Sequence, residues 1–236
     1  MIPADEIKKV VRGRYGRIST NACCVESACR GPATAPPTGF IGPALGCGSP
    51  LAYADVQPGE TVLDLGSGAG RDVLLAARQV GPAGRVVGVD MTPEMVGKAR
   101  ENARRVGIGN AEFYLADVEH LPLPDASVDV VISNCVINLV PDKLRVFREA
   151  YRVMRPGGRF VVADIVATGP LPDKIRADPD AWAACIAGAI DVKDYLALIR
   201  QAGFRDVTTM AADDAAPGQV FSVTVRAVKP AEPAGG

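Results

Sequence analysis

Beyond residue 50 the chain alternates short runs of β-branched and aliphatic residues with longer stretches of helical character. This alternation is typical of a parallel sheet whose strands are joined by crossover helices. The predicted helices cover about 70–79, 93–105 and 142–154, and the second begins with Thr92-Pro93-Glu94, a cap residue followed by proline. The predicted strands are Thr61 to Leu65, Arg85 to Asp90, Ala111 to Leu115, Val128 to Ser133 and Arg159 to Asp164.

The last part of the chain predicts how this sheet ends. Two helices at about 172–188 and 191–202 precede strand candidates at Phe204 to Met210 and Val220 to Val225. A terminal antiparallel hairpin of this kind distinguishes the class I methyltransferase fold from that of a dinucleotide dehydrogenase. We therefore predict an α/β fold with a class I methyltransferase Rossmann-like sheet, mostly parallel with an antiparallel C-terminal hairpin, plus an irregular N-terminal arm.

The residues before the alternating pattern have a different character. A basic amphipathic helix is expected within residues 1–20, ending near Tyr15-Gly16. From Cys23 to Pro50 the chain is rich in Gly, Pro, Ala and Cys and lacks periodicity, so we expect an irregular arm or lid. Hydrophobic residues make up 48% of the 236 residues, which is enough for one core. The predicted organisation is a helix and arm over 1–50 and one domain over 51–230.

Charge and composition exclude several partners. The formal net charge is -1, and no basic stripe tracks along the chain, so we expect no nucleic acid partner. No run reaches the roughly 18 apolar residues that a membrane-spanning helix needs, and the N-terminus lacks a secretory pattern. We expect a cytoplasmic protein, in which the six cysteines are thiols rather than a permanent disulfide framework.

The sharpest motif runs from Asp64 to Gly70, Asp-Leu-Gly-Ser-Gly-Ala-Gly, where a predicted strand meets a helix. Glycines there let the backbone turn tightly and approach a ligand closely. A dinucleotide-binding loop has its third glycine one position later and receives a pyrophosphate at the helix N-terminus. A carboxylate at Asp64 would repel a pyrophosphate but suits the ammonium and sulfonium charges of S-adenosylmethionine.

Two further acids follow the next two strands. Asp90 ends the second strand and can accept hydrogen bonds from both ribose hydroxyls, and Asp117 follows the third, where a carboxylate can accept from an adenine amino group. Each acid alone could equally be a cap or turn residue. Because ligands of open α/β sheets bind at this edge, the three acids together with the glycines predict an S-adenosylmethionine site.

The methyl acceptor is indicated less directly. Oxygen and nitrogen acceptors often need a base, yet the only histidine, His120, fits a loop better than a catalytic role. Cys135 follows the fourth strand at the ligand edge, although free cysteine is often simply buried. Cys185 alone looks like an ordinary residue of an apolar helix, whereas the glycines on both sides of Cys47 suggest an exposed, adaptable loop. No pair has the Cys-x-x-Cys spacing of a zinc or redox site.

Several blocks, taken together and in this order, closely resemble the arsenite methyltransferase family over about residues 11–205. The cofactor loop is generic, whereas the block from Ser133 to Leu139, Ser-Asn-Cys-Val-Ile-Asn-Leu, and the later Cys-x-x-Gly-Ala block are specific to that family. The matching blocks are Thr20 to Cys23, Gly46 to Gly48, Asp64 to Asp72, Val89 to Thr92, Ser133 to Leu139 and Cys185 to Ala189.

The resemblance implies that Cys47, Cys135 and Cys185 bind As(III) of arsenite or methylarsenite, with part of the site in an insertion at about 167–202. It also implies that Cys23 exchanges disulfides with Cys47 and that thioredoxin or glutathione restores the thiols. The expected catalytic residues are thus Cys23, Cys47, Cys135 and Cys185. The expected cofactor-binding residues are Asp64, Gly66, Ser67, Gly68, Gly70, Arg71, Asp90, Met91, Asp117, Val118 and Asn134.

The chain also departs from the family's pattern. Cys24 and Cys29 are extra thiols beside Cys23, so the exchange partner of Cys47 stays open among the three. Leu45 stands where relatives often have tyrosine, and the C-terminal extension of some relatives is expected to be missing. Two alternatives remain: a methyltransferase for a quinone or another small carbon or oxygen acceptor, and a metalloid-binding protein without turnover. The three cysteines argue against the first and the intact cofactor loop against the second.

Overall fold

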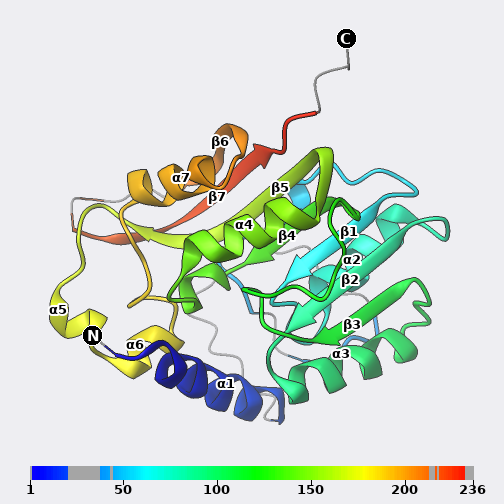
Figure 1. Ribbon diagram of the computed structural model, residues 1–236. Coiled ribbons are helices and arrows are strands. Elements are labelled where there is room, and N and C mark those ends of the chain that lie inside the picture. The colour runs from blue at the N-terminus through cyan, green and yellow to red at the C-terminus, as the bar shows by residue number, and fades with distance from the viewer. Residues whose placement is uncertain (1, 21–37, 43–44, 213–215, 217, 232–236) are drawn as a thin grey trace.

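The computed structural model describes residues 2–20, 38–42, 45–212, 216 and 218–231. Its centre is a seven-stranded sheet in the order β3-β2-β1-β4-β5-β7-β6 (Figure 1). The first five strands of that order are parallel, whereas β7 runs antiparallel to both β5 and β6. The predicted fold class is therefore confirmed. The strands are β1 (Thr61–Leu65), β2 (Arg85–Asp90), β3 (Ala111–Leu115), β4 (Val128–Asn134), β5 (Met154–Ala167), β6 (Arg205–Ala212) and β7 (Val220–Val228).

The strand β5 is longer than predicted at both ends. Val128 pairs with Met154 and Val130 with Arg159, so two steps along β4 match five along β5. The extra residues form a bulge within β5, with Gly157 at φ +80, and the strand begins at Met154 instead of at the predicted Arg159. Because β7 pairs with β5 from Arg159 to Ala167, the strand also continues beyond the predicted end at Asp164.

Helices cover both faces of the sheet and bury two separate apolar layers. Adjacent residues of a strand point to opposite faces, so Val62 packs in the layer with α2 and α3 and Leu63 in the layer with α4 and α7. In the second layer Phe147 meets Tyr195 edge-on at 5.4 Å between ring centroids. The helices are α2 (Arg71–Val80), α3 (Pro93–Arg105), α4 (Lys143–Val153) and α7 (Val192–Gln201).

The predicted helix at 172–188 is wrong: the segment holds two short helices, α5 (Asp173–Arg176) and α6 (Pro179–Ala183). Pro179 has no amide hydrogen to continue the first helix, and Asp178 caps the second by accepting from the Asp180 amide. The helix α6 ends before Cys185, whose φ of +63 is incompatible with a helix interior. This break brings Cys185 out of a helix and into a buried turn.

The helix α1 (Ala4–Thr20) confirms the predicted N-terminal helix but continues past Tyr15-Gly16. Gly16 does not end it, since a helix tolerates a glycine where another element packs closely, here the Glu94 carboxylate. The helix lies across the carboxyl edge of the sheet, against α3 and α6 (Figure 1). Two short 3-10 turns, η1 (Pro50–Tyr53) and η2 (Ile137–Leu139), complete this edge. In the described part of the chain, no helix has the length and apolar character to cross a membrane.

Candidate functional site

A cavity of about 600 Å³ lies at the carboxyl edge of the parallel strands, beneath α1. Because the strands stand in the order β3-β2-β1-β4, the residues that follow them line the cavity in a fixed sequence. Asp117 comes first, then Asp90, then the glycine loop, then Cys135. Every expected cofactor-binding residue lines this cavity except Gly70. The predicted carboxyl-edge site is thus where these residues meet.

The glycine loop is shaped by close packing. Gly66 has φ +70, and a Cβ there would overlap the Val136 side chain. Gly68 donates its amide to Asp90 Oδ2 at 2.9 Å, which ties the loop to β2. Gly70 has φ +87 and immediately precedes α2, and a Cβ there would lie 3.0 Å from the Phe113 ring. The structure therefore gives Gly70 a role in starting the helix and no contact with the cavity.

Three carboxylates give the cavity a negative centre. Asp64 is 3% exposed, and its pKa is raised well above the usual range by burial and by the charges of Asp72 and Asp90. Burial likewise raises the pKa of Asp72, although the charge of Arg71 and a hydrogen bond from Asn134 oppose the shift. Burial also raises the pKa of Asp90. A cation placed among these groups would stabilise their ionised forms.

Asp90 and Asp117 are already engaged by protein donors. Asp90 accepts from the amides of Gly68 and Thr92, at 2.9 and 2.8 Å, and each oxygen keeps a second lone pair for a ligand. Asp117 accepts from Lys8 Nζ at 2.6 Å and from the Glu119 amide at 3.0 Å. Burial opposes ionisation of Asp117, but these two donors lower its pKa overall. The link from Lys8 to Asp117 and Glu119, which sequence reasoning missed, holds α1 over this end of the cavity.

The cavity residues fit S-adenosylmethionine. The negative centre suits a ligand that carries sulfonium and ammonium charges, and the glycine loop leaves room where a Cβ would obstruct it. Ser67 Oγ is buried beside the cavity and has no hydrogen-bond partner among the described residues. A buried polar atom without a partner in the protein is satisfied when a ligand supplies one.

The structure corrects the prediction for Cys47. Its side chain is 6% exposed instead of lying in an exposed, adaptable loop. Asn134 Oδ1 accepts from the Cys47 amide at 3.0 Å, and Ser222 Oγ donates to the Cys47 carbonyl at 2.6 Å. The flanking glycines permit this docking, since a Cβ on Gly46 would lie 2.5 Å from the Asn134 side chain and one on Gly48 would lie 2.6 Å from Ala163 Cβ. The glycines therefore serve close approach and not mobility.

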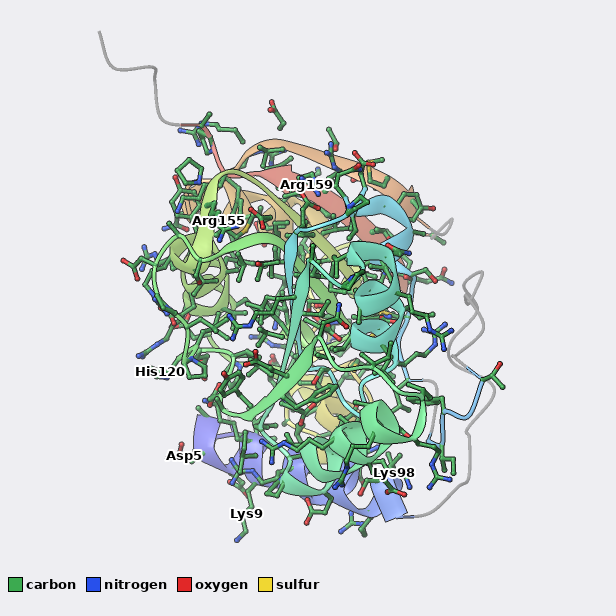
Figure 2. All side chains as sticks on the ribbon, turned by 90° about the vertical axis from the view of Figure 1, so that its right-hand side faces the viewer. Asp5, Lys9, Lys98, His120, Arg155 and Arg159 are labelled. Carbon is green, nitrogen blue, oxygen red and sulfur yellow. A yellow bond between two sulfur atoms is a disulfide. The ribbon has the colours of Figure 1, made fainter. Side chains whose placement is uncertain are left out.

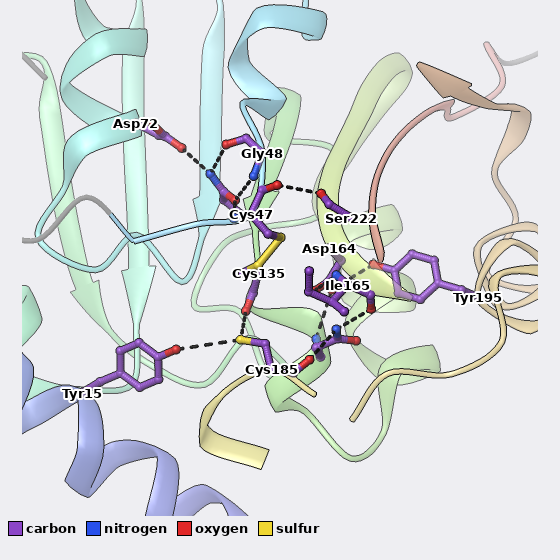
Figure 3. Close-up of a disulfide and its surroundings, with 12 residues drawn as sticks. Tyr15, Cys47, Gly48, Asp72, Cys135, Asp164, Ile165, Cys185, Tyr195 and Ser222 are labelled. Atoms are coloured by element: carbon purple, nitrogen blue, oxygen red, sulfur yellow. Dashed lines mark hydrogen bonds between the residues drawn. A yellow bond between two sulfur atoms is a disulfide. The ribbon is translucent and has the colours of Figure 1, made fainter. Parts of the chain in front are cut away.

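The cysteines of three distant segments meet at this point (Figure 3). Cys47 and Cys135 are joined by a disulfide, with 5.8 Å between their Cα atoms. Cys185 is 7% exposed, and its Sγ donates to the Cys135 carbonyl at 3.2 Å. The predicted exchange partners of Cys47, which are Cys23, Cys24 and Cys29, lie outside the described residues. The structure thus joins Cys47 to Cys135, a pairing that was not foreseen, and the pairing with Cys23 stays a prediction.

Sequence reasoning also assigned no role to three polar residues that surround these cysteines. Asn138 is fully buried and donates from Nδ2 to the carbonyls of Cys185, at 3.1 Å, and of Ile165. Tyr15 Oη lies 3.9 Å from Cys185 Sγ, so α1 contacts the cysteine cluster directly (Figure 3). Asp164, also fully buried, lies beside the disulfide. Asn138 lies within the Ser133–Leu139 block, whereas Tyr15 and Asp164 lie outside every block that carries the resemblance.

His120 confirms its predicted place in a loop. It is exposed at the surface (Figure 2). It lies next to Arg145 on α4 and does not line the cavity. Carboxylates, sulfurs, Lys8 and Tyr15 are among the groups that line the described part of the cavity, and an imidazole is not.

Comparison with known proteins places this geometry in a wider group. Residues 57–203 match the family model described as a methyltransferase domain. An arsenite methyltransferase of Halobacterium salinarum is 56% identical over 170 residues, which cover 72% of this chain and 44% of that protein. An arsenite methyltransferase of Aquipseudomonas alcaligenes is 40% identical over 83% of this chain and 61% of its own length.

A solved structure is also similar. The crystal structure of an arsenic (III) S-adenosylmethionine methyltransferase from Chlamydomonas reinhardtii matches with a TM-score of 0.70 and 37% identity, over 80% of this chain and 69% of that one. The chain spans between 44% and 61% of the length of the two curated relatives above. The family-model match includes the carboxylate side of the cavity and two of its three cysteines, Cys135 and Cys185, whereas Cys47 and the cavity residues of α1 lie outside residues 57–203.

Proposed function

Because this chain belongs to the arsenite methyltransferase family of class I, S-adenosylmethionine-dependent methyltransferases, we propose that it methylates trivalent arsenic bound to cysteine sulfur. The single observation that carries the proposal is the convergence of Cys47, Cys135 and Cys185 beside the carboxylate-lined cavity. A carbon or oxygen acceptor gives no reason for three sulfurs at that place. A metalloid-binding protein without turnover would have no use for the glycine loop.

S-adenosylmethionine, when bound, supplies an electrophilic methyl group. The chain's own residues would hold it: Asp90 would accept from the ribose hydroxyls, Asp117 would accept from the adenine amino group, and Asp64 would lie near the positive charges, since all three line the cavity. The Asp64 carboxylate is costly to ionise without a counter-charge, so the site favours a cationic ligand over a neutral one.

The cysteines supply the acceptor. Thiolates are soft ligands that suit arsenic, and three of them leave arsenic as a trigonal pyramid with its lone pair on the open side. That lone pair would act as the nucleophile toward the methyl group, so no base would be needed to remove a proton. The absence of an imidazole from the described cavity residues is consistent with this chemistry.

Methylation oxidises the arsenic, and two thiolates can return the two electrons by forming a disulfide. The bond between Cys47 and Cys135 joins two of the proposed ligands, so it must be reduced before arsenite can bind all three. We propose that Cys23 replaces Cys135 as the disulfide partner of Cys47 and that thioredoxin or glutathione then restores the thiols. We also propose that this cycle takes place in the cytoplasm. Arsenite and methylarsenite are the proposed substrates.

The test is arsenic speciation after incubating the reduced protein with arsenite, S-adenosylmethionine and a thiol reductant. Methylated arsenic that disappears without S-adenosylmethionine supports the proposal. The variants Cys135→Ser and Cys185→Ser should abolish methylation of both arsenite and methylarsenite, and Cys23→Ser should be milder on methylarsenite. Ala184→Ser is the matched control, since it adds a hydroxyl next to Cys185 without removing a sulfur. Full turnover by Cys135→Ser would contradict the three-sulfur site, and cofactor binding without methylated arsenic would favour the carbon acceptor.

A further inference from the structure

Asp164 is a buried carboxylate on β5 that the proposed methyl transfer does not use. One carboxylate oxygen of Asp164 and the Sγ atoms of Cys47 and Cys135 all lie within 4.8 Å of one another. The residue is 0% exposed. A carboxylate is almost never fully buried unless it is paired or coordinates a metal. Arsenic, which selects sulfur, gives no reason for an oxygen ligand at this position.

We propose that Cys47, Cys135 and Asp164, once the disulfide is reduced, form a binding site for Zn²⁺. Zinc accepts thiolates and carboxylates together, at about 2.3 Å for sulfur and about 2.0–2.2 Å for oxygen. Ligand atoms of such a tetrahedron lie about 3.4–3.8 Å apart. After reduction the two sulfurs must separate to this spacing, and the carboxylate oxygen already lies within 4.8 Å of both. Cys47 and Cys135 line the cavity, so an ion can enter there and a water molecule can take the fourth position.

Asp164 is held as a metal-binding carboxylate usually is. Its Oδ2 accepts from the Asn138 amide and from Tyr195 Oη, both at 3.1 Å, and its Oδ1 accepts from the Ile165 amide at 3.1 Å. Outer hydrogen bonds of this kind orient the ligand and are characteristic of metal sites. A carboxylate offers about four lone-pair positions, so Oδ1 keeps one for an ion.

The charges also balance. Two thiolates and one carboxylate carry three negative charges, against two positive charges on zinc. The remaining charge is matched by Lys143, which is 5% exposed and interacts electrostatically with Asp164. Lys143 is fixed by donating to the carbonyls of Ile137 and Val140. The Lys143 ammonium thus offsets part of the desolvation of the anionic ligands, although burial still raises the pKa of Asp164 to about 7.

The zinc and arsenic sites share two sulfurs and differ in the third ligand, which is Asp164 for zinc and Cys185 for arsenic. Zinc should therefore inhibit arsenite methylation reversibly, and this competition rests on the proposed function whereas the zinc site does not. Opening the disulfide takes two electrons and two protons, which a phosphine and water supply as the phosphine becomes its oxide. Zinc binding then releases the thiol protons to the buffer.

The test uses the full chain with Cys23, Cys24 and Cys29 changed to serine, so that the arm cannot contribute sulfur. The protein is reduced with a phosphine, freed of reagent without oxygen, loaded with Zn²⁺ alone and measured by zinc K-edge X-ray absorption. We expect two sulfur neighbours at about 2.3 Å and two lighter neighbours at about 2.0–2.2 Å. A shell of three or more sulfurs, or no bound zinc, would overturn the site.

Variants separate this inference from the proposed function. Asp164→Asn should weaken Zn²⁺ affinity by at least about tenfold, the lower limit for losing even an outer partner of a metal ligand, and should leave arsenite binding in place. The variant Cys185→Ser should weaken arsenite binding and leave the Zn²⁺ affinity in place. If Asp164→Asn does not fold, the absorption spectrum of the protein with Asp164 intact decides alone. Arsenite binding without zinc binding refutes only the zinc site, whereas zinc binding without arsenite binding refutes only the proposed function.

Discussion

Replacing Asn134 by alanine should release Cys47 from the site without unfolding the domain. The Asn134 side chain makes four hydrogen bonds at the end of β4. Its Oδ1 accepts from the amides of Cys47 and Gly48, at 3.0 and 3.3 Å. Its Nδ2 donates to the Gly48 carbonyl at 2.9 Å and to Asp72 Oδ2 at 3.3 Å. Alanine would leave three backbone groups of the cysteine loop without these partners.

The magnitude follows from those three groups. A buried polar group left without its partner costs about 1–3 kcal/mol. Because Asn134 is only half-buried and the loop borders a cavity, water would replace part of each bond. We expect a loss of about 2 kcal/mol in the docking of the loop, which corresponds to about 30-fold weaker arsenite binding when Cys47 is one of the ligands.

The assay is a titration of the reduced protein with arsenite, followed by the fluorescence of Trp182, the chain's one tryptophan, which lies close to Cys185. Asn110→Ala is the matched control. Asn110 also donates to three backbone carbonyls, those of Ala77, Gly81 and Gly84, but it does not line the cavity. The control should lower the free energy of unfolding while leaving arsenite affinity unchanged. Equal arsenite affinity of Asn134→Ala and the unchanged protein would refute the positioning role.

Two other changes test the cavity and the loop. Burial raises the pKa of Asp64 well above the 3.8 of an unfolded chain, so the ligand-free fold loses stability as the pH rises above 3.8. The variant Asp64→Asn should remove this loss, which raises Tm at pH 7, and should weaken S-adenosylmethionine binding. A lower Tm of this variant at pH 7 would contradict the argument. The variant Gly48→Ala, whose Cβ would lie 2.6 Å from Ala163 Cβ, should lower both the free energy of unfolding and the arsenite affinity. As the control, Gly97→Ala in the exposed interior of α3 should raise the free energy of unfolding by about 0.5–1 kcal/mol. Denaturant unfolding measures the stability of both variants.

The central strands were predictable because they are buried on both faces. Such strands are nearly continuous apolar runs, and β1 and β2 have the predicted bounds. The edge strand β3 also has its predicted bounds, although it is only partly buried. The ends of β5 were not predictable from the sequence, because they depend on the bulge near Gly157 and on pairing with β7, both of which involve distant segments. The division of 172–188 into two helices was signalled by Pro179, whose effect on the preceding helix outweighed the apolar pattern.

The cofactor half of the cavity was predictable for a similar reason. Its residues follow the ends of successive strands, so local sequence position determines spatial position once the sheet is known. The cysteine half depends on contacts between distant segments: Cys47 and Cys135 are 88 residues apart, and Cys185 follows a further helix pair. The burial of Cys47 and the place of Asp164 have no local signal, since a glycine suits mobility as well as close packing and an acid within a strand resembles scaffold.

The cysteine half of the cavity couples ion binding to the stability of the fold, because its sulfurs come from distant segments. An ion that needs sulfur from three distant segments binds only the folded chain with full strength, so it stabilises the fold by mass action. The effect is smaller when the unfolded chain also binds the ion, and the adjacent Cys23 and Cys24 offer two sulfurs in any conformation. The rise in Tm with arsenite should therefore be larger when Cys23 and Cys24 are serine than in the unchanged chain. The opposite order would mean that the arm contributes sulfur to the folded site.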